Sequence, residues 1–377
     1  MSAPWAVVAG DFTALGGMDA ANAGLAAHLA GRGGVTLVAH RVAGELADWP
    51  GVTVELAARP LGSHLLGEPL LDRLVRREAA RTSERGGRVV VNGGNCRWPD
   101  INWLHYVHAA DDTPASGVKA RWHRRRALRR ERDIVPTSRI AVCNSFKTAR
   151  DALERLPMPA DRVRVVYYGC DPVACAAVTP SERRAARAAL GWGDGPWVAF
   201  VGALGDTRKG FDTLYAAWKS LCAGPGWDAR LAVVGAGASL DAWRERATAD
   251  GLTRRVAFLG FRPDVPRVLA AADALVHPAR YEPYGLAVHE ALCRGLPAVV
   301  SATAGVAERY PPGLADLLLQ NPTDAGELAD RLRHWRDALD AWPARVADFA
   351  EQLRGYTWDA MAADFVRAVE AGDPCGS

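Results

Sequence analysis

The sequence lacks the features that mark several classes of protein. No stretch approaches the roughly 18 uncharged apolar residues of a membrane-spanning helix. The seven cysteines include no Cys-x-x-Cys pair. That spacing argues against a disulfide framework or a structural zinc site, and it favours a reducing compartment. The first residues, Met-Ser-Ala-Pro-Trp, lack the basic and apolar regions of a signal peptide, so we expect a cytoplasmic protein.

What the sequence contains is typical of a globular protein with two domains. Its 377 residues are enough for two domains of roughly 150 to 200 residues each. Apolar residues make up 49% of the chain, and the formal net charge is only +3. This charge by itself indicates no particular partner.

Residues 274–301 have the pattern strand, loop, helix, strand. The apolar run Ala274–Val276 is too short for a helix, and Pro278 and Pro283 keep the following residues out of one. A helix is expected from Gly285 to about Arg294, with a strand beginning at Val299. Such a unit belongs to a parallel α/β sheet, where ligands bind beyond the carboxyl ends of the strands.

Two carboxylates flank this loop, Glu282 and Glu290, with seven residues between them. The N–H groups near Gly285 and Leu286 begin a helix and favour an anion such as phosphate. Phosphate beside two carboxylates suits a ligand with a diphosphate and hydroxyls, such as a nucleotide sugar. Two solvated surface glutamates are the alternative.

The stretch resembles the E-x7-E signature of the retaining GT-B glycosyltransferases of family 4. The resemblance implies that Glu282 holds the donor sugar and Glu290 the nucleotide ribose. It also implies that Tyr284, Gly285 and Leu286 line the donor site. The matching residues are Glu282, Pro283, Gly285, Leu286, Glu290, Ala291, Gly295, Leu296 and Pro297.

The chain begins with a predicted β-α-β unit and a glycine-rich first turn. A strand over 5–9, a helix over about 18–30 and a strand over 35–39 are expected. The turn ends in Gly16 and Gly17, which allow close backbone approach to a ligand, although a plain tight turn is the alternative. The Gly-x-Gly-x-x-Gly dinucleotide spacing is absent. The turn resembles the family's Gly-Gly-Met segment, whose loop faces the donor phosphates and the acceptor.

Two histidines, His105 and His108, lie near the end of a predicted strand over 101–107. They are candidates for binding or catalysis, or alternatively they pack or cap. In the family a histidine at this point contacts the donor sugar, and His108 fits that context better than His105. A metal pair is disfavoured, since no carboxylate–histidine cluster with ligand spacing accompanies them.

Residues 119–132 hold eight Lys or Arg together with Trp122 and Leu128. A helix of this kind suits anionic lipid or a phosphorylated acceptor. It is also compatible with a solvated helix that binds nothing. Nucleic acid is the weakest option, because the domain as a whole is only mildly basic.

The second half begins with a predicted strand over 197–201 and a loop that contains Arg208 and Lys209. A basic pair in a glycine-flanked loop before a helix suits a diphosphate, or alternatively it is exposed to solvent. Lys209-Gly210 matches the family, but the family's arginine is replaced by Ala203. We hypothesise that Arg208 supplies this charge. The segment at Arg262 resembles the place where the family's backbone meets the nucleotide base.

The resemblance implies the GT-B fold, two Rossmann-like α/β domains with parallel sheets facing a central cleft. We expect an acceptor-side domain over 1–172, a donor-side domain over 173–355, and a terminal helix over 356–377 that crosses back to the first domain. A helix over 69–85 and a strand over 314–319 are also expected.

The implied activity is retaining transfer of a hexose-type sugar from a nucleotide diphosphate, UDP or GDP, to a hydroxyl. His108, Glu282, Lys209 and Arg208 are the catalytic candidates. No Asp-x-Asp motif occurs, so no metal and no further cofactor are expected. A small soluble acceptor is favoured, while a lipid-linked acceptor and peripheral membrane contact stay open. A nucleotide-sugar epimerase and a non-catalytic partner subunit are the alternatives.

Overall fold

The computed structural model describes residues 3–13, 16–114 and 117–371. The chain forms two compact units. The first consists of Met1–Gly169 together with Thr357–Ser377, and the second of Cys170–Tyr356. No helix in the described residues is long and apolar enough to cross a membrane.

The first unit is built on a parallel sheet of seven strands in the order β5-β3-β1-β6-β7-β8-β9. Several of these strands are fully apolar runs that lie buried, as expected for a sheet covered on both faces. Their bounds are β1 Trp5–Val8, β3 Val35–Ala39, β5 Val52–Leu56, β6 Arg88–Asn92, β7 Ile101–Leu104, β8 Ile140–Cys143 and β9 Val163–Val165. Two short strands, β2 Asp11–Phe12 and β4 Arg41–Val42, pair separately.

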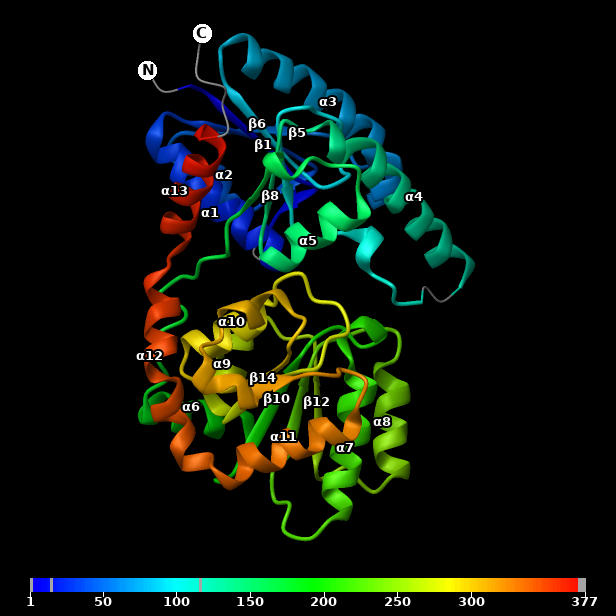
Figure 1. Cartoon of the computed structure of the whole chain (residues 1–377), viewed down its shortest axis with the longest axis vertical. Helices are drawn as coiled ribbons and strands as arrows, with labels where there is room; N and C mark the ends of the chain where they lie inside the picture. Colours follow the sequence, from blue (N-terminus) through cyan, green and yellow to red (C-terminus); the bar gives the residue numbers. More distant parts are fainter. Residues whose placement is uncertain (1–2, 14–15, 115–116, 372–377) are drawn as a thin grey trace. The chain divides into compact units, whose positions relative to one another are not determined.

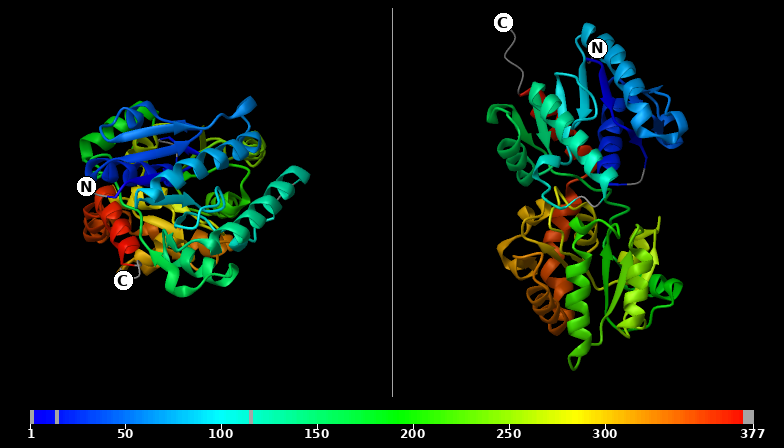
Figure 2. Two further views of the ribbon diagram at one scale, coloured as in Figure 1. Left: turned by 90° about the horizontal axis from the view of Figure 1, so that it is seen from above. Right: turned by 90° about the vertical axis from the view of Figure 1, so that its right-hand side faces the viewer.

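Helices lie on both faces of this sheet (Figures 1 and 2). They are α1 Gly17–Arg32, α2 Gly44–Ala47, α3 His64–Glu84, α4 Val118–Ile134, α5 Phe146–Arg155 and α13 Trp358–Glu370. The last of these comes from the end of the chain and packs against α1. A Cβ on Gly24 would lie 3.0 Å from Cβ of Trp358, so glycine allows this close helix packing.

The second unit contains a parallel sheet of six strands in the order β12-β11-β10-β13-β14-β15. The strands are β10 Trp197–Val201, β11 Arg230–Val234, β12 Val256–Gly260, β13 Ala274–His277, β14 Ala298–Ser301 and β15 Leu318–Leu319. Its helices are α6 Pro180–Leu190, α7 Phe211–Ala223, α8 Leu240–Ala249, α9 Val265–Ala271, α10 Leu286–Cys293, α11 Ala325–Asp337 and α12 Trp342–Gly355. Large buried side chains such as Trp218, Trp335 and Trp342 fill its core.

Three predicted elements differ from the structure. The strand expected over 101–107 ends at Leu104. The expected strand over 314–319 is mostly a 3-10 helix, Pro312–Leu317, and only Leu318–Leu319 pair as a strand. The helix expected from residue 69 begins at 64, so that Pro69 lies inside α3. Pro69 is the sixth residue of α3 and lies past the first N–H groups, which have no partner in a helix, so α3 lacks one interior backbone hydrogen bond at this position.

Candidate functional site

The candidate site of the second unit begins where β13 ends. Glu282 follows this strand by five residues and is only 8% exposed. Its backbone carbonyl accepts a hydrogen bond of 3.1 Å from the N–H of Gly305. The loop is therefore fixed by backbone contacts, and the carboxylate is held away from bulk water.

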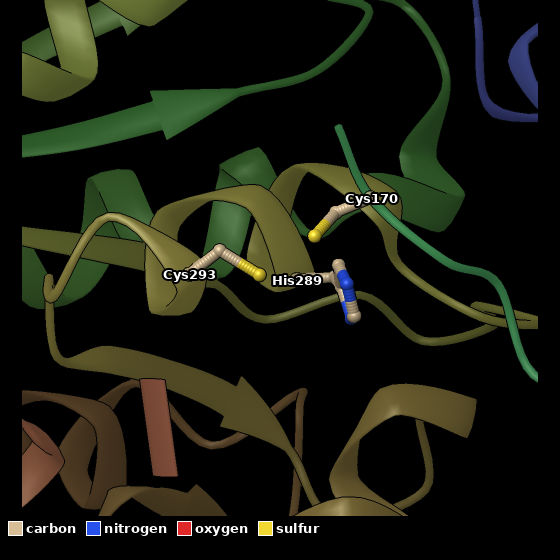
Figure 3. A group of neighbouring side chains, drawn as sticks. All are labelled: Cys170, His289 and Cys293. Atoms are coloured by element: carbon tan, nitrogen blue, oxygen red, sulfur yellow. The ribbon is translucent and has the colours of Figure 1, made fainter. Parts of the chain in front are cut away.

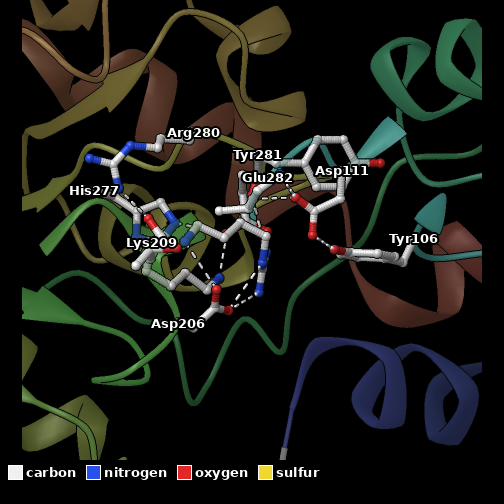
Figure 4. A network of polar contacts seen from close by, with 11 residues as sticks. Tyr106, Asp111, Asp206, Lys209, His277, Arg280, Tyr281 and Glu282 are labelled. Carbon is white, nitrogen blue, oxygen red and sulfur yellow. Dashed lines mark hydrogen bonds and ion pairs between the residues drawn. The ribbon is translucent and has the colours of Figure 1, made fainter. Parts of the chain in front are cut away.

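Two side chains converge on one oxygen of Glu282 (Figure 4). The ammonium of Lys209 lies 2.6 Å from Oε2, and Nε2 of His277 lies 2.8 Å from the same atom. A carboxylate paired with Lys209 is an acceptor only, so Nε2 of His277 is the nitrogen that donates. Nδ1 of His277 is buried and has no hydrogen-bond partner among the described residues.

These neighbours determine the ionisation of Glu282. Burial by itself would raise the pKa of this carboxyl, but the Lys209 charge and the His277 hydrogen bond outweigh that effect. The pKa of Glu282 therefore lies well below its usual range. Burial lowers the pKa of His277, so its imidazole is neutral near pH 7. The site thus holds an ionised glutamate beside a cation and a neutral imidazole.

Lys209 ends the short 3-10 helix Thr207–Lys209 in the loop between β10 and α7. Asp206 caps this turn, because its carboxylate accepts the N–H of Arg208 at 3.0 Å. Gly210 follows with φ of +68°, and a Cβ there would lie 1.9 Å from the carbonyl oxygen of Pro278. Glycine is therefore required for the close approach of the Lys209 loop to the Glu282 loop.

Arg208, the predicted substitute for the missing family arginine, has its guanidinium held within the site. Nη2 lies 3.0 Å from the Asp206 carboxylate, and Nη1 donates to the carbonyl of Tyr281 at 3.1 Å. Arg280 ties the two loops together, because its N–H donates to the carbonyl of Arg208 and its guanidinium pairs with Asp212. Arg208 lies beside Lys209, and its proposed contact with a diphosphate stays a prediction.

Helix α10 begins directly after this loop. Its N-cap, Gly285, has φ of +107°, in the region that favours glycine. The first N–H groups, from Leu286 onward, have no partner within the helix and form a partial positive charge. Further along α10, burial raises the pKa of Glu290 to about 7, and the nearby Arg294 opposes this shift. No hydrogen bond joins the Glu290 carboxylate to another group in the described chain.

Two further donor-binding candidates are engaged by their own neighbours. The ring of Tyr284 is buried, and its hydroxyl lies 3.0 Å from Nδ1 of His289. The side chain of Tyr284 therefore lies in the interior of the unit. Arg262 follows β12 and forms two hydrogen bonds, of 2.8 and 2.7 Å, to the carboxylate of Asp264.

The first-unit candidates are placed as follows. Gly16, with φ of +124°, is the N-cap of α1, and Gly17 is the first residue of this helix. A Cβ on Gly16 would meet no atom within 4 Å, so open space surrounds it. The helix therefore presents its N-terminus at the end of the glycine-rich turn, whose residues 14–15 lie outside the described part.

The two histidines after β7 have different surroundings. His108 is exposed, and its backbone N–H donates to the buried carboxylate of Glu131 at 2.8 Å. His105 instead contacts Oδ1 of Asn92 through Nε2, at 2.9 Å, and the hydroxyl of Tyr168 through Nδ1. His105 thus has partners at both ring nitrogens, whereas the ring of His108 lies at the surface.

Three residues of the second-unit site were not singled out from the sequence. His277 bonds Glu282, Asp206 caps the Lys209 turn, and Arg280 joins the two loops. The sequence did contain a signal for His277, because this residue follows an apolar run that forms a buried strand and comes just before a proline. Asp206 acts within its own turn, two residues from Arg208. Arg280 acts through contacts with residues 68 to 73 positions away, which spacing in the sequence does not reveal.

Comparison with known proteins gives a family match in this unit. Residues 195–337 match the family described as "Glycosyl transferases group 1". A D-inositol 3-phosphate glycosyltransferase of Nocardia farcinica is 33% identical over 219 residues, covering 56% of this chain and 46% of the relative. A protein of the same description from Corynebacterium aurimucosum is 32% identical over 288 residues, which cover 70% of this chain and 64% of the relative. The match therefore spans about half to two thirds of these relatives.

Solved structures match along nearly the whole chain. Anabaena Alr3699/HepE in complex with UDP and glucose has a TM-score of 0.77 at 19% identity, covering 98% of this chain and 100% of that one. The sucrose-phosphate synthase of Thermosynechococcus elongatus also has a TM-score of 0.77, at 22% identity, covering 99% and 100%. These similarities, with the two parallel-sheet units, show that the chain has the GT-B fold and that its second unit matches the group 1 glycosyl transferases.

Proposed function

We propose that the protein is a retaining glycosyltransferase that moves a hexose-type sugar from a nucleoside diphosphate sugar to a hydroxyl acceptor. The observation that carries this proposal is the buried carboxylate of Glu282, one oxygen of which accepts hydrogen bonds from both Lys209 and His277. Its second oxygen can accept hydrogen bonds from sugar hydroxyls. Lys209 adds a fixed positive charge beside the place where the sugar would sit.

The N-terminus of α10 supplies the second element of the site. Its N–H groups favour the diphosphate, and Lys209, with Arg208 beside it, would stabilise the negative charge on the leaving group. Because these groups already provide positive charge, the proposed site needs no metal ion. In the retaining reaction the leaving phosphate would accept the acceptor's proton on the face from which it departs.

Glu290 is proposed to bind the ribose of the donor. It lies on α10 eight residues after Glu282, and its half-buried carboxylate has no hydrogen-bond partner in the described chain. A nucleoside ribose offers two hydroxyl donors to such a carboxylate. Burial of an unpaired carboxylate is costly, so ribose hydroxyls would satisfy a group that the folded chain leaves unsatisfied.

Descriptions of similar proteins support a uridine nucleotide as the first donor to test. Solved structures of HepE are described in complex with UDP and with UDP-glucose. The sequence relatives are described as D-inositol 3-phosphate glycosyltransferases, which is compatible with a small hydroxylated acceptor here. We therefore propose UDP- or GDP-sugar as donor and a small soluble molecule as acceptor.

Thermal unfolding against a panel of nucleotides and nucleotide sugars tests the donor site directly. A ligand that binds only the folded state raises the melting temperature. We expect a shift with one base, and we expect Glu290→Ala to lose it. Glu351→Ala, at an exposed position of α12, is the matched control and should keep the shift. No shift with any UDP, GDP, ADP or TDP compound would contradict the proposal.

Product analysis separates the two alternatives that share the fold. With the donor alone, an epimerase would return an epimerised nucleotide sugar, whereas a transferase requires an acceptor or slowly hydrolyses its donor. A non-catalytic subunit would show neither reaction. Retention is tested by the anomeric configuration of the glycoside product, measured by its proton coupling in nuclear magnetic resonance.

A further inference from the structure

A second cluster of chemically reactive groups lies inside the second unit, formed by Cys170, His289 and Cys293 (Figure 3). One ligand atom from each residue lies within 4.8 Å of those of the other two. All three residues are buried, with exposures of 1%, 0% and 0%. Cys170 is more than 100 residues away from α10 in the sequence, so the fold alone brings these groups together.

The imidazole of His289 has one unsatisfied nitrogen. The hydroxyl of Tyr284 lies 3.0 Å from Nδ1, whereas the buried Nε2 has no hydrogen-bond partner among the described residues. A buried polar atom without a partner costs free energy. Histidines that bind metals commonly have one nitrogen on the ion and the other on a hydrogen-bonding neighbour. The surroundings of His289 therefore suit a metal ligand.

A third thiol lies next to the cluster. Cys175 is only 8% exposed and its thiol lies beside that of Cys170, but its sulfur does not belong to the group of ligand atoms that all lie within 4.8 Å of one another. Cys175 reaches this place through a turn, because its N–H donates to the carbonyl of Asp171 at 2.9 Å. The second unit thus offers three thiols and one imidazole, which is an established tetrahedral ligand set for zinc.

We propose that Cys170, His289 and Cys293 bind a Zn²⁺ ion, with Cys175 as the fourth ligand. The cysteine spacing argued against a structural zinc site, because these ligands come from two segments that only the fold brings together. In a tetrahedral zinc site, neighbouring ligand atoms lie about 3.5–3.8 Å apart. The ligand atoms of Cys170, His289 and Cys293 already lie within 4.8 Å of one another, whereas the sulfur of Cys175 has to move closer to at least one of them to complete the set. Each thiol loses its proton to solvent as its sulfur bonds to zinc, so the ion replaces three protons.

The ion would connect two segments that matter for the unit's architecture. Cys170 is the first residue of the second unit, and its sulfur also lies near the carbonyls of Leu353 and Arg354. His289 and Cys293 both lie on α10, on either side of Glu290. Zinc would therefore fix this eight-residue helix to the start of the unit. The site is structural and does not depend on the proposed reaction.

Metal analysis of the purified full chain tests the proposal. We expect about one zinc per chain after expression with added zinc, and at least a ten-fold lower content in Cys293→Ser and in His289→Gln. Cys222→Ser is the matched control, because Cys222 is a half-buried thiol of the same unit outside the cluster. This variant should retain the wild-type zinc content.

A second measurement covers the case in which the variants do not fold. Wild-type protein is stripped with a chelator and then titrated with zinc alone, while its melting temperature is followed. We expect stoichiometric zinc to raise the melting temperature and to release protons, which a weakly buffered indicator detects. The proposal would be overturned if wild-type protein is purified without zinc and added zinc does not change its melting temperature. Equal loss of zinc in Cys222→Ser would overturn the assignment to these residues.

Discussion

Each unit has a histidine at the carboxyl end of a buried parallel strand, and the two have opposite surroundings. His105 follows β7 in the first unit, and His277 ends β13 in the second. Both of the His105 nitrogens have neutral partners, Asn92 and Tyr168. His277 donates to the ionised Glu282, while its other nitrogen has no partner among the described residues.

The comparison teaches that position at a strand end does not by itself distinguish a functional histidine from a structural one. Around His105, Asn92 also donates to the carbonyl of Val8, and Asn144 also donates to Tyr168. That network contains no charged group and gives both ring nitrogens a partner, so its expected contribution is to stability. Around His277, charge is concentrated and one nitrogen is unused, so the expected contribution is to ligand binding.

The largest expected effect comes from breaking the charged network. Lys209→Ala removes the cation that holds Glu282 and that would face the leaving group. We expect transferase activity to fall about 1000-fold, in line with the loss of one well-placed electrostatic stabiliser. Initial rates with the donor identified by thermal unfolding measure this effect. Lys219→Ala, which removes an exposed lysine paired with Asp250, is the control and should retain activity. A Lys209→Ala rate within ten-fold of wild type would contradict the role of Lys209.

The neutral network is tested by Tyr168→Phe. The change removes a buried hydroxyl and leaves Nδ1 of His105 and the amide of Asn144 without this partner. We expect the free energy of unfolding to fall by about 1–3 kcal/mol, measured by urea unfolding. Donor affinity should be unchanged, because Tyr168 is buried and its hydroxyl contacts His105 and Asn144. A large loss of donor affinity at wild-type stability would mean that the first-unit network serves binding instead.

Much of the fold was predictable from short apolar runs and from proline and glycine. The strand over 197–201 and the helix near 285–294 follow from such signals, and the structure has them within one residue. The prediction of a strand over 314–319 was wrong, because Leu314 and Leu317 are buried as part of a 3-10 helix instead. Apolar runs report burial, and burial alone does not distinguish a strand from a tight helix.

The site was predictable where a motif lies within one stretch of sequence. Glu282, Gly285 and Glu290 lie in such a stretch, and the structure places them around one loop and helix start. The partners of Glu282 were harder to predict from the sequence. The ion pair with Lys209 joins residues 73 positions apart, and only the close approach of the Gly210 loop to the Pro278 loop brings them together.

A smaller effect is expected for Arg208→Ala. Comparing it with Lys209→Ala separates the contributions of the two cations in the charged network. If Arg208 supplies the charge absent at Ala203, donor affinity should fall about ten-fold, or about 1.4 kcal/mol. Isothermal titration with the donor measures this change, and Arg267→Ala, an exposed arginine of α9, is the control. Unchanged affinity in Arg208→Ala, combined with a large loss in Lys209→Ala, would show that Lys209 alone provides the charge.

The smallest expected effect is the pH dependence of stability at His105. Burial lowers the pKa of His105 to about 3, from an ordinary value of 6.5, so the folded chain disfavours the protonated ring. Below pH 6.5 the unfolded chain binds a proton that the folded chain does not, and the free energy of unfolding falls as the pH falls. Relative to His105→Gln, which does not titrate, the free energy of unfolding of wild type should fall by about 1 kcal/mol between pH 6.5 and 5.5.

Urea unfolding of both proteins at each pH measures this difference. His123→Gln, on the exposed face of α4, is the control and should leave the pH dependence of wild type unchanged. Parallel curves for wild type and His105→Gln would mean that the ring accepts a proton in the folded state, and that the first-unit network does not keep His105 neutral.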